Sequence, residues 1–199
     1  MVVYYKYNRG DLMRRKDDEK EKNIKEAVIK LILEQGFHGT SISKIAKEAG
    51  VSPATVYIYY ENKEVMLRDI YLEYSDEILD YLLSKLYKEM DGHELIEMLT
   101  RSYYTYIQEH GEIFHFVDQF SSCPSLSNQC SEQRNINNLN LLLEEMKRKR
   151  VIKNFRNDNL MAIIFYPIKS IAIKHCTGEL EQMELLEEMI TIIQDALLV

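Results

Sequence analysis

The sequence predicts an all-α fold, and three observations support this prediction. Only 7 Gly and 3 Pro occur among 199 residues, so long segments contain no helix-breaking residue. Apolar residues recur at spacings of three and four along these segments, and no segment has the alternation typical of a strand. The composition is 46% hydrophobic and 29% charged, which is typical of a globular chain and not of a disordered one.

Capping residues and glycines set the limits of the first helices. Gly36 and Gly50 each end an amphipathic segment, because glycine readily adopts the left-handed conformation that closes a helix. Ser52 is an N-cap followed by Pro53 at the first helical position, where its missing N–H costs nothing, and Asn62 caps the next helix. After a loose arm over residues 1–16, we expect helices over residues 17–35, 41–49, 53–60 and 62–89.

The remainder of the chain predicts further helices, and the last two have the strongest apolar faces. We expect them over residues 93–109, 112–121, 132–150, 157–177 and 180–198. Two long apolar faces at the end of a closed domain favour a symmetric dimer, in which each chain gives two helices to a four-helix bundle. Burial within one chain is the alternative. The residues expected at this interface are Ile164, Ile168, Ile171, Leu186, Ile190, Ile193 and Leu197.

Charge and cysteine content narrow the class of protein. The net charge is −7, yet residues 1–63 hold 12 Lys/Arg against 9 Asp/Glu, so a mildly basic head precedes a strongly acidic body. Cys123, Cys130 and Cys176 have no CxxC spacing, which argues against a disulfide framework and a zinc site and fits a reducing cytosol. We expect no metal and no cofactor. No apolar stretch is long enough to span a bilayer, so we expect a cytoplasmic protein.

The segment "GTSISKIAKEAGVSPATVYIYYENKE" has helix-turn-helix character. A short amphipathic helix, a tight turn at Gly50 and a second short helix match the arrangement in which the second helix enters a DNA major groove. Val56 and Tyr60 are four residues apart and should pack inward. The opposite side is expected to carry Ala54, Thr55, Ile58 and Tyr59.

Several residues of this segment are suited to DNA contacts. The small side chain of Ala54 permits close approach, and Thr55 can bond a base edge or touch a thymine methyl. Hydroxyls of tyrosines and the ammonium of Lys63, at a helix N-terminus, suit phosphate oxygens. In the alternative, the tyrosines fill a small core and Lys63 is solvated. The residues expected at DNA are Thr40, Ser41, Ser52, Ala54, Thr55, Tyr57, Tyr59 and Lys63.

Residues 23–67 resemble the DNA-binding domain of the TetR family of bacterial transcriptional regulators. The resemblance lies in the Thr opening, the I-A-x-x-A-G-V-S run, the Tyr-x-Tyr-aromatic ending and N-K-E before an apolar helix. Ala54, where many members have Gly, and Tyr60, where Phe is commoner, depart from the pattern. The resemblance implies an all-helical homodimer, usually a repressor, that binds a palindromic operator and is released by a small effector.

By this resemblance, residues 17–63 form a three-helix helix-turn-helix DNA-binding domain, and residues 64–199 form a helical effector-binding and dimerisation bundle. An aromatic group in the body is the candidate effector site, with ordinary core packing as the alternative. A regulator controlled by a protein partner also remains open. An enzyme is disfavoured, because no nucleophile elbow, P-loop, Rossmann glycine motif or HExxH occurs. The candidate effector residues are Tyr103, Tyr106, Phe114, Phe116, Phe120, Phe165 and Tyr166.

Overall fold

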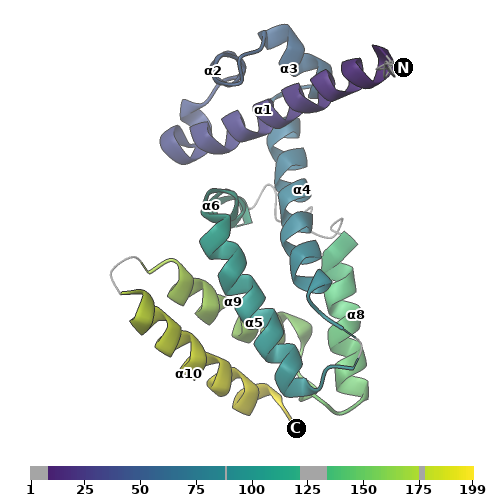
Figure 1. Ribbon diagram of the computed structural model, residues 1–199, viewed down its shortest axis with the longest axis vertical. Helices are drawn as coiled ribbons and strands as arrows, with labels where there is room; N and C mark the ends of the chain where they lie inside the picture. The colour runs from purple at the N-terminus through teal and green to yellow at the C-terminus, as the bar shows by residue number, and fades with distance from the viewer. Residues whose placement is uncertain (1–8, 88, 122–133, 175–177) are drawn as a thin grey trace, which may run out of the picture. The chain divides into compact units, whose positions relative to one another are not determined.

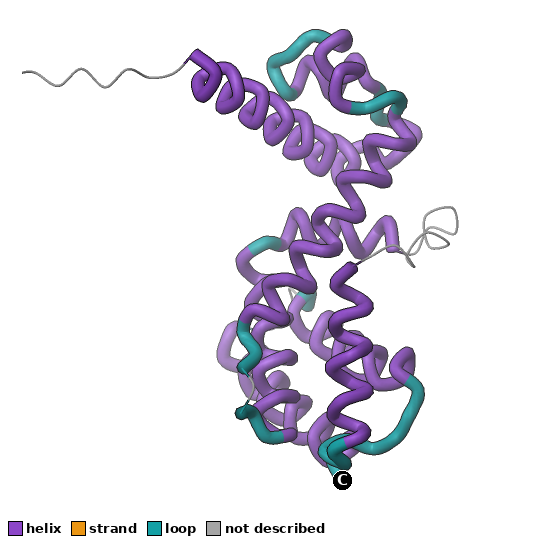
Figure 2. Tube along the Cα trace, turned by 90° about the vertical axis from the view of Figure 1, so that its right-hand side faces the viewer, coloured by secondary structure: helices purple, strands orange, loops and turns teal. Residues whose placement is uncertain are grey.

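The computed structural model describes residues 9–87, 89–121, 134–174 and 178–199, with side chains described from Asp17 onward and not at 134–135. All three cysteines lie outside these residues. The described chain is helical with no strand, apart from one isolated bridge between Ile152 and Leu198 (Figures 1 and 2). This confirms the all-α prediction. The chain divides into two compact units between Tyr71 and Leu72.

The first unit contains α1 (Arg9–Gly39), α2 (Ile42–Glu48), α3 (Pro53–Tyr59) and the start of α4 (Lys63–Ser84). Helix α1 begins at Arg9, so the expected loose arm over residues 1–16 is wrong for its second half. The reason is that no Pro and, after Gly10, no Gly interrupts the segment before Gly36. Residues 1–8 lie outside the described chain.

The starts of α2, α3 and α4 follow the sequence closely, whereas α4 ends at Ser84 and not at the expected residue 89. Gly36 leaves the helical conformation inside α1, with φ of 69° and ψ of 176°, so the last residues of α1 form a separate turn. Ser41 and Ser52 are the N-caps of α2 and α3. The side chain of Asn62 accepts a hydrogen bond of 2.8 Å from the N–H of Val65, which confirms it as the cap of α4.

The core of the first unit lies where α1, α2, α3 and the first turns of α4 meet. Each helix contributes apolar side chains on one face, which is why helices of seven residues are stable here. Val56 and Tyr60 are buried, as the spacing predicted. The main buried side chains are Ile24, Val28, Ile32, Ile45, Val56, Tyr60, Met66, Leu67 and Ile70.

The second unit is a helical bundle. Its helices are α5 (Gly92–Glu109), α6 (Gly111–Ser121), α8 (Arg134–Arg148), α9 (Asn157–Ala172) and α10 (Glu179–Leu197), together with the end of α4. Helix α5 packs against α9 and α10, which lie beside each other in Figure 1. Asp91 and Glu94 form a reciprocal capping box at the start of α5.

The residues expected at a dimer interface occupy the core of this bundle instead. All seven, from Ile164 to Leu197, are buried within the single chain, and Ile168 is completely inaccessible. The expectation is therefore corrected, because the structure shows the alternative of burial within one chain. All of these residues except Ile171 belong to the hydrophobic core of the second unit, where α5, α9 and α10 pack against one another. Periodicity correctly identified an apolar stripe on each helix, but a stripe does not reveal which surface covers it.

No helix in the described part of the chain is both long enough and apolar enough to cross a membrane.

Candidate nucleic-acid interface

The turn between α2 and α3 is held by its own hydrogen bonds. The N–H of Val51 donates to the carbonyl of Ala46 at 2.9 Å, and Gly50 has the left-handed φ of 68° that this turn requires. The hydroxyl of Ser52 then accepts from the N–H of Thr55 at 3.1 Å, capping α3. Local chemistry of these residues thus fixes the direction in which α3 leaves the turn.

Helix α3 has one covered and one free face. Val56 and Tyr60 point into the core of the first unit. The free face carries Ala54, Tyr57 and Ile58, and the last two are 56% and 79% exposed. Positions 54 and 58 are four residues apart, so they lie side by side on this face. The free face has no charged side chain, which is unusual for a solvent-exposed helix.

Two hydroxyls expected at DNA are engaged within the protein. Thr55 is half-buried, and its hydroxyl lies 2.9 Å from that of Ser52. The hydroxyl of Tyr59 donates to the backbone carbonyl of Asp17 at 2.9 Å, so this ring is turned toward α1. Burial, and secondarily the nearby carboxylate of Asp17, raise the pKa of Tyr59. The structure thus places Tyr59 beside α1 and not on the free face of α3.

The position of Thr40 contradicts the expectation that its side chain contacts DNA. Its side chain is buried, and its hydroxyl is 3.1 Å from the carbonyl of Leu31 and 3.0 Å from that of Gly36. It therefore donates to two carbonyls near the point where Gly36 leaves the helical conformation of α1. A hydroxyl in this position is not accessible to a phosphate. Ser41, by contrast, is exposed at the N-terminus of α2.

Lys63 is half-buried, and its ammonium points toward the end of α1. Its ammonium donates to the carbonyl of Phe37 and, at 2.6 Å, to the carbonyl of Thr40, and it lies 4.0 Å from the centre of the Phe37 ring. Burial lowers the pKa of this ammonium. The partially negative carbonyl groups at the end of α1 are therefore the partners of this ammonium. The expectation that this ammonium contacts a phosphate is therefore corrected.

The same turn is bound by a second lysine that sequence reasoning missed. Lys44 of α2 donates to the carbonyl of Gly39 at 2.6 Å and to the side-chain oxygen of Gln35 at 2.7 Å. No sequence pattern marks such a lysine, because its main acceptor is a backbone carbonyl present at every residue.

The aromatic residues proposed as an effector site do not form one group in the second unit: Phe116 contacts Phe120 at a centroid distance of 4.8 Å, apart from the rings around Tyr103. Tyr106, Phe114, Phe116 and Phe120 are buried. The ring of Tyr103 contacts those of Phe114 and Phe165, at centroid distances of 5.8 and 5.0 Å. Burial, with a contribution from Asp118, raises the pKa of Tyr103. Tyr166 is 65% exposed and does not belong to this group.

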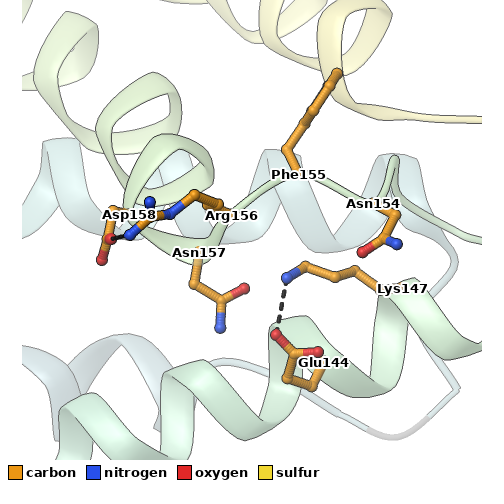
Figure 3. Close-up of a pocket in the computed structure, with 7 residues that line it drawn as sticks. All are labelled: Glu144, Lys147, Asn154, Phe155, Arg156, Asn157 and Asp158. Atoms are coloured by element: carbon orange, nitrogen blue, oxygen red, sulfur yellow. Dashed lines mark hydrogen bonds and ion pairs between the residues drawn. The ribbon is translucent and has the colours of Figure 1, made fainter.

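A polar hollow of about 410 Å³ lies elsewhere in the second unit, between the end of α8 and the segment that leads into α9 (Figure 3). Its walls include Glu144 and Lys147, joined at 2.8 Å, and Arg156 and Asp158, joined at 3.4 Å. Hydrogen bonding from Lys147 lowers the pKa of Glu144. The charges on the walls therefore largely compensate each other. Among the described residues, no cluster of His, Cys, Asp or Glu has the arrangement of a metal site.

A short exposed helix set across a tight turn from its partner defines the helix-turn-helix class of DNA-binding proteins. Comparison with known proteins agrees, because residues 24–70 match the family model described as bacterial regulatory proteins, tetR family. Residues 24–70 therefore carry the DNA-binding domain of the TetR family of transcription regulators, and proteins similar to the chain outside this segment are transcriptional regulators as well.

Three similar proteins show the extent of the likeness. The fatty acid metabolism regulator protein of Bacillus subtilis (strain 168) is 28% identical over 82 residues, which cover 41% of this chain and 42% of that protein. The matched segment thus spans less than half of that relative's length. A TetR family transcription regulator from Marinobacter aquaeolei VT8 is 28% identical, with a TM-score of 0.78 over 93% of this chain and 98% of that chain. FadR from Bacillus subtilis, in complex with stearoyl-CoA, shares the fold at 19% identity, with a TM-score of 0.69 over 88% of this chain and 98% of that chain.

Proposed function

We propose that this protein is a repressor that binds a palindromic operator as a homodimer and is released by a small effector. The observation that carries the proposal is the free face of α3, which is uncharged, exposed and held by a capped turn. Two such helices related by a two-fold axis suit two half-sites of one operator. Such a protein would act in the cytoplasm, where the operator is accessible.

We propose that the two functions belong to consecutive segments of the chain. Residues 17–63 would bind DNA through α3, with Ser41, Ser52, Ala54 and Tyr57 near the duplex. Residues 64–199 would form the effector-binding and dimerisation domain. The uncharged face of α3 would pack against the bases of the major groove. The backbone N–H groups and hydroxyls around it would bind phosphates.

We propose a revised dimer surface on the outer faces of α9 and α10. Helix α10 carries Leu185, Met189, Ile192 and Ala196 at spacings of four, three and four, outside the buried stripe. These residues are half-buried or exposed in the single chain, and Ile192 is 50% exposed. Helix α9 adds Ile163 and Tyr166, also exposed. These residues are uncharged, with the exposed Glu188 at the edge of the stripe, so a second copy of the chain would cover a mainly apolar surface.

The effector is proposed to bind in the body, next to the aromatic group around Tyr103. The side chains packed around Tyr103 are mainly apolar, and Lys169 and Asp118 form an ion pair of 2.8 Å in the same unit. A largely apolar compound with one polar end suits such surroundings. Because one similar fold was solved with stearoyl-CoA, acyl-CoA thioesters and fatty acids are the first compounds to test by thermal shift. Control by a protein partner is the alternative if none of the compounds stabilises the protein.

Selection of bound DNA from a random duplex pool tests the proposal. Purified full-length protein at physiological salt should enrich one palindromic sequence. Failure of folded protein to enrich any sequence would contradict operator binding. Addition of a stabilising compound should then release the selected duplex, since an effector acts only by binding the DNA-incompetent arrangement more tightly.

A further inference from the structure

The recognition helix lacks the side chains that most often read bases. Its seven residues, PATVYIY, include no Arg, Lys, Asn, Gln, Asp or Glu. Specific recognition of guanine usually needs Arg or Lys, and specific recognition of adenine usually needs Asn or Gln, because these groups form paired hydrogen bonds to the purine edge. A helix α3 that binds DNA would therefore read the sequence by another means.

Hydroxyl groups do not replace the missing side chains. The hydroxyl of Thr55 is engaged with that of Ser52 at 2.9 Å. The hydroxyl of Tyr59 donates to the carbonyl of Asp17. Tyr57 remains exposed, but a long phenolic side chain at the edge of the helix suits the phosphate backbone. The centre of the free face is then formed by Ala54 and Ile58.

We propose that Ile58, with Ala54 beside it, contacts the methyl groups of thymines in the major groove. This inference rests on the proposed operator binding and specifies how the operator is read. Thymine is the one DNA base with an apolar group on the major-groove edge, and small or branched apolar side chains are its natural partners. Ile58 is 79% exposed, so most of its side chain is available to a methyl group. Each operator half-site should accordingly hold one or two thymines facing α3.

Replacement of single thymidines by deoxyuridine tests this inference. The change removes only the 5-methyl group and leaves every base-pairing hydrogen bond in place. With the selected operator, we expect one or two positions in a half-site at which deoxyuridine weakens binding roughly fourfold, the effect of one buried methyl-sized group. The remaining thymidines, which do not face α3, should tolerate the change and serve as internal controls.

The assignment to Ile58 is tested by a double-mutant cycle with Ile58→Ala. At the sensitive position, this variant should bind thymidine and deoxyuridine duplexes equally, because the partner of the methyl group is gone. Leu141→Ala, which alters a side chain 69% exposed in α8, should keep the full discrimination of the unaltered protein. Affinities are measured by fluorescence anisotropy at one salt concentration.

The outcomes separate the two proposals. If no sequence is enriched in the selection, operator binding fails before thymine reading is tested. If a palindrome is enriched but every deoxyuridine duplex binds as tightly as thymidine, the methyl contact is refuted while operator binding stands. If discrimination persists in Ile58→Ala, the contact belongs to another residue and the assignment is overturned.

Discussion

The ammonium of Lys63 lies 4.0 Å from the centre of the Phe37 ring and donates a hydrogen bond to the carbonyl of the same residue. A second bond of 2.6 Å reaches the carbonyl of Thr40. One side chain from the first residue of α4 thus binds the turn that ends α1. The aromatic ring and the carbonyl end of the helix each attract this cation.

The first prediction concerns this lysine. Lys63→Met keeps the apolar stem over Phe37 but removes the ammonium, leaving two carbonyls without their donor. We expect the first unit to lose about 1.5–3 kcal/mol of stability, the usual worth of hydrogen bonds to a charged group. Operator affinity should fall because the turn before α2 is loosened. Urea unfolding and anisotropy titrations measure the two effects.

Salt dependence distinguishes this positioning role from a phosphate contact. A lysine that neutralises one phosphate contributes roughly 0.9 to the slope of log K against log salt. Lys63→Met should leave that slope unchanged, since the ammonium is turned inward. Lys63→Arg, which keeps the charge, should restore part of the stability. Lys47→Met, at an exposed position of α2, is the matched control and should leave the stability of the unit intact. A flatter slope for Lys63→Met would show instead that Lys63 contacts a phosphate.

The second prediction concerns the buried hydroxyl of Thr40. Thr40→Val preserves the shape of the side chain but leaves the carbonyls of Leu31 and Gly36 without this donor. We expect a loss of roughly 1–3 kcal/mol, the cost of unsatisfied buried polar groups. Thr191→Val is the control, because its hydroxyl donates to a carbonyl on an exposed face of α10 and should matter little. Equal effects of the two variants on urea unfolding would contradict the role of burial.

The third prediction compares two tyrosines of α3 that differ in exposure. Tyr57→Phe should weaken operator binding by about 1 kcal/mol through a lost phosphate hydrogen bond, with the thermal midpoint unchanged. Tyr59→Phe should instead lower the thermal midpoint, because it removes the bond from α3 to the carbonyl of Asp17. Each variant is the control for the other. The opposite pattern would show that the two hydroxyls have been assigned to the wrong partners.

The helix-turn-helix was predictable because its signals are local. Ser52, Pro53 and Gly50 specify a cap, a helix start and a turn within four positions, and the structure realises each one. The inward position of Val56 and Tyr60 followed from their spacing alone. These features depend on neighbouring residues and require no knowledge of distant contacts.

The roles of Lys63 and Thr40 were not predictable, because they depend on the groups that these side chains contact in the folded unit. Their acceptors are backbone carbonyls, which every residue has, and those of Lys63 lie 26 and 23 positions away in the chain. Similarly, the periodicity of α9 and α10 indicated apolar faces without showing that α5 covers them. Sequence gives the face of a helix, whereas the covering surface depends on the packing of the whole unit.

The fourth prediction concerns pH and the pair of Arg101 and Glu187, which joins α5 to α10 through two hydrogen bonds of 2.6 and 2.5 Å. The hydrogen bond from Arg101 holds the pKa of the Glu187 carboxyl below its ordinary value of 4.5. A carboxyl whose pKa is lower in the folded state stabilises the protein above its unfolded pKa. This contribution is lost as pH falls through the folded pKa.

Glu187→Gln should therefore lower the thermal midpoint slightly at neutral pH, and the difference from the unaltered protein should vanish once the pH has fallen below the folded pKa of this carboxyl. The effect is small because both side chains are partly exposed to water. Glu188→Gln, an exposed neighbour on the same helix, is the control. A difference that is independent of pH would show that the carboxylate charge is not responsible.

The fifth prediction tests the dimer surface with two matched changes on α10. Ile192→Asp places a charge among Leu185, Met189 and Ala196, where the second copy is proposed to pack. We expect dissociation to monomers, because an unpaired charge in an apolar interface is strongly unfavourable. Sedimentation at several protein concentrations measures the change. Operator affinity should fall with it, since the two heads then bind independently.

Leu180→Asp provides the control, because it introduces the same charge at an apolar position of α10 that is 77% exposed but lies on another side of the helix. This variant should remain dimeric and bind the operator normally. Both changed side chains are exposed in the single chain, so neither variant should unfold it. Dissociation by Leu180→Asp and not by Ile192→Asp would move the interface to the other face of α10. Monomeric behaviour of the unaltered protein would refute the dimer.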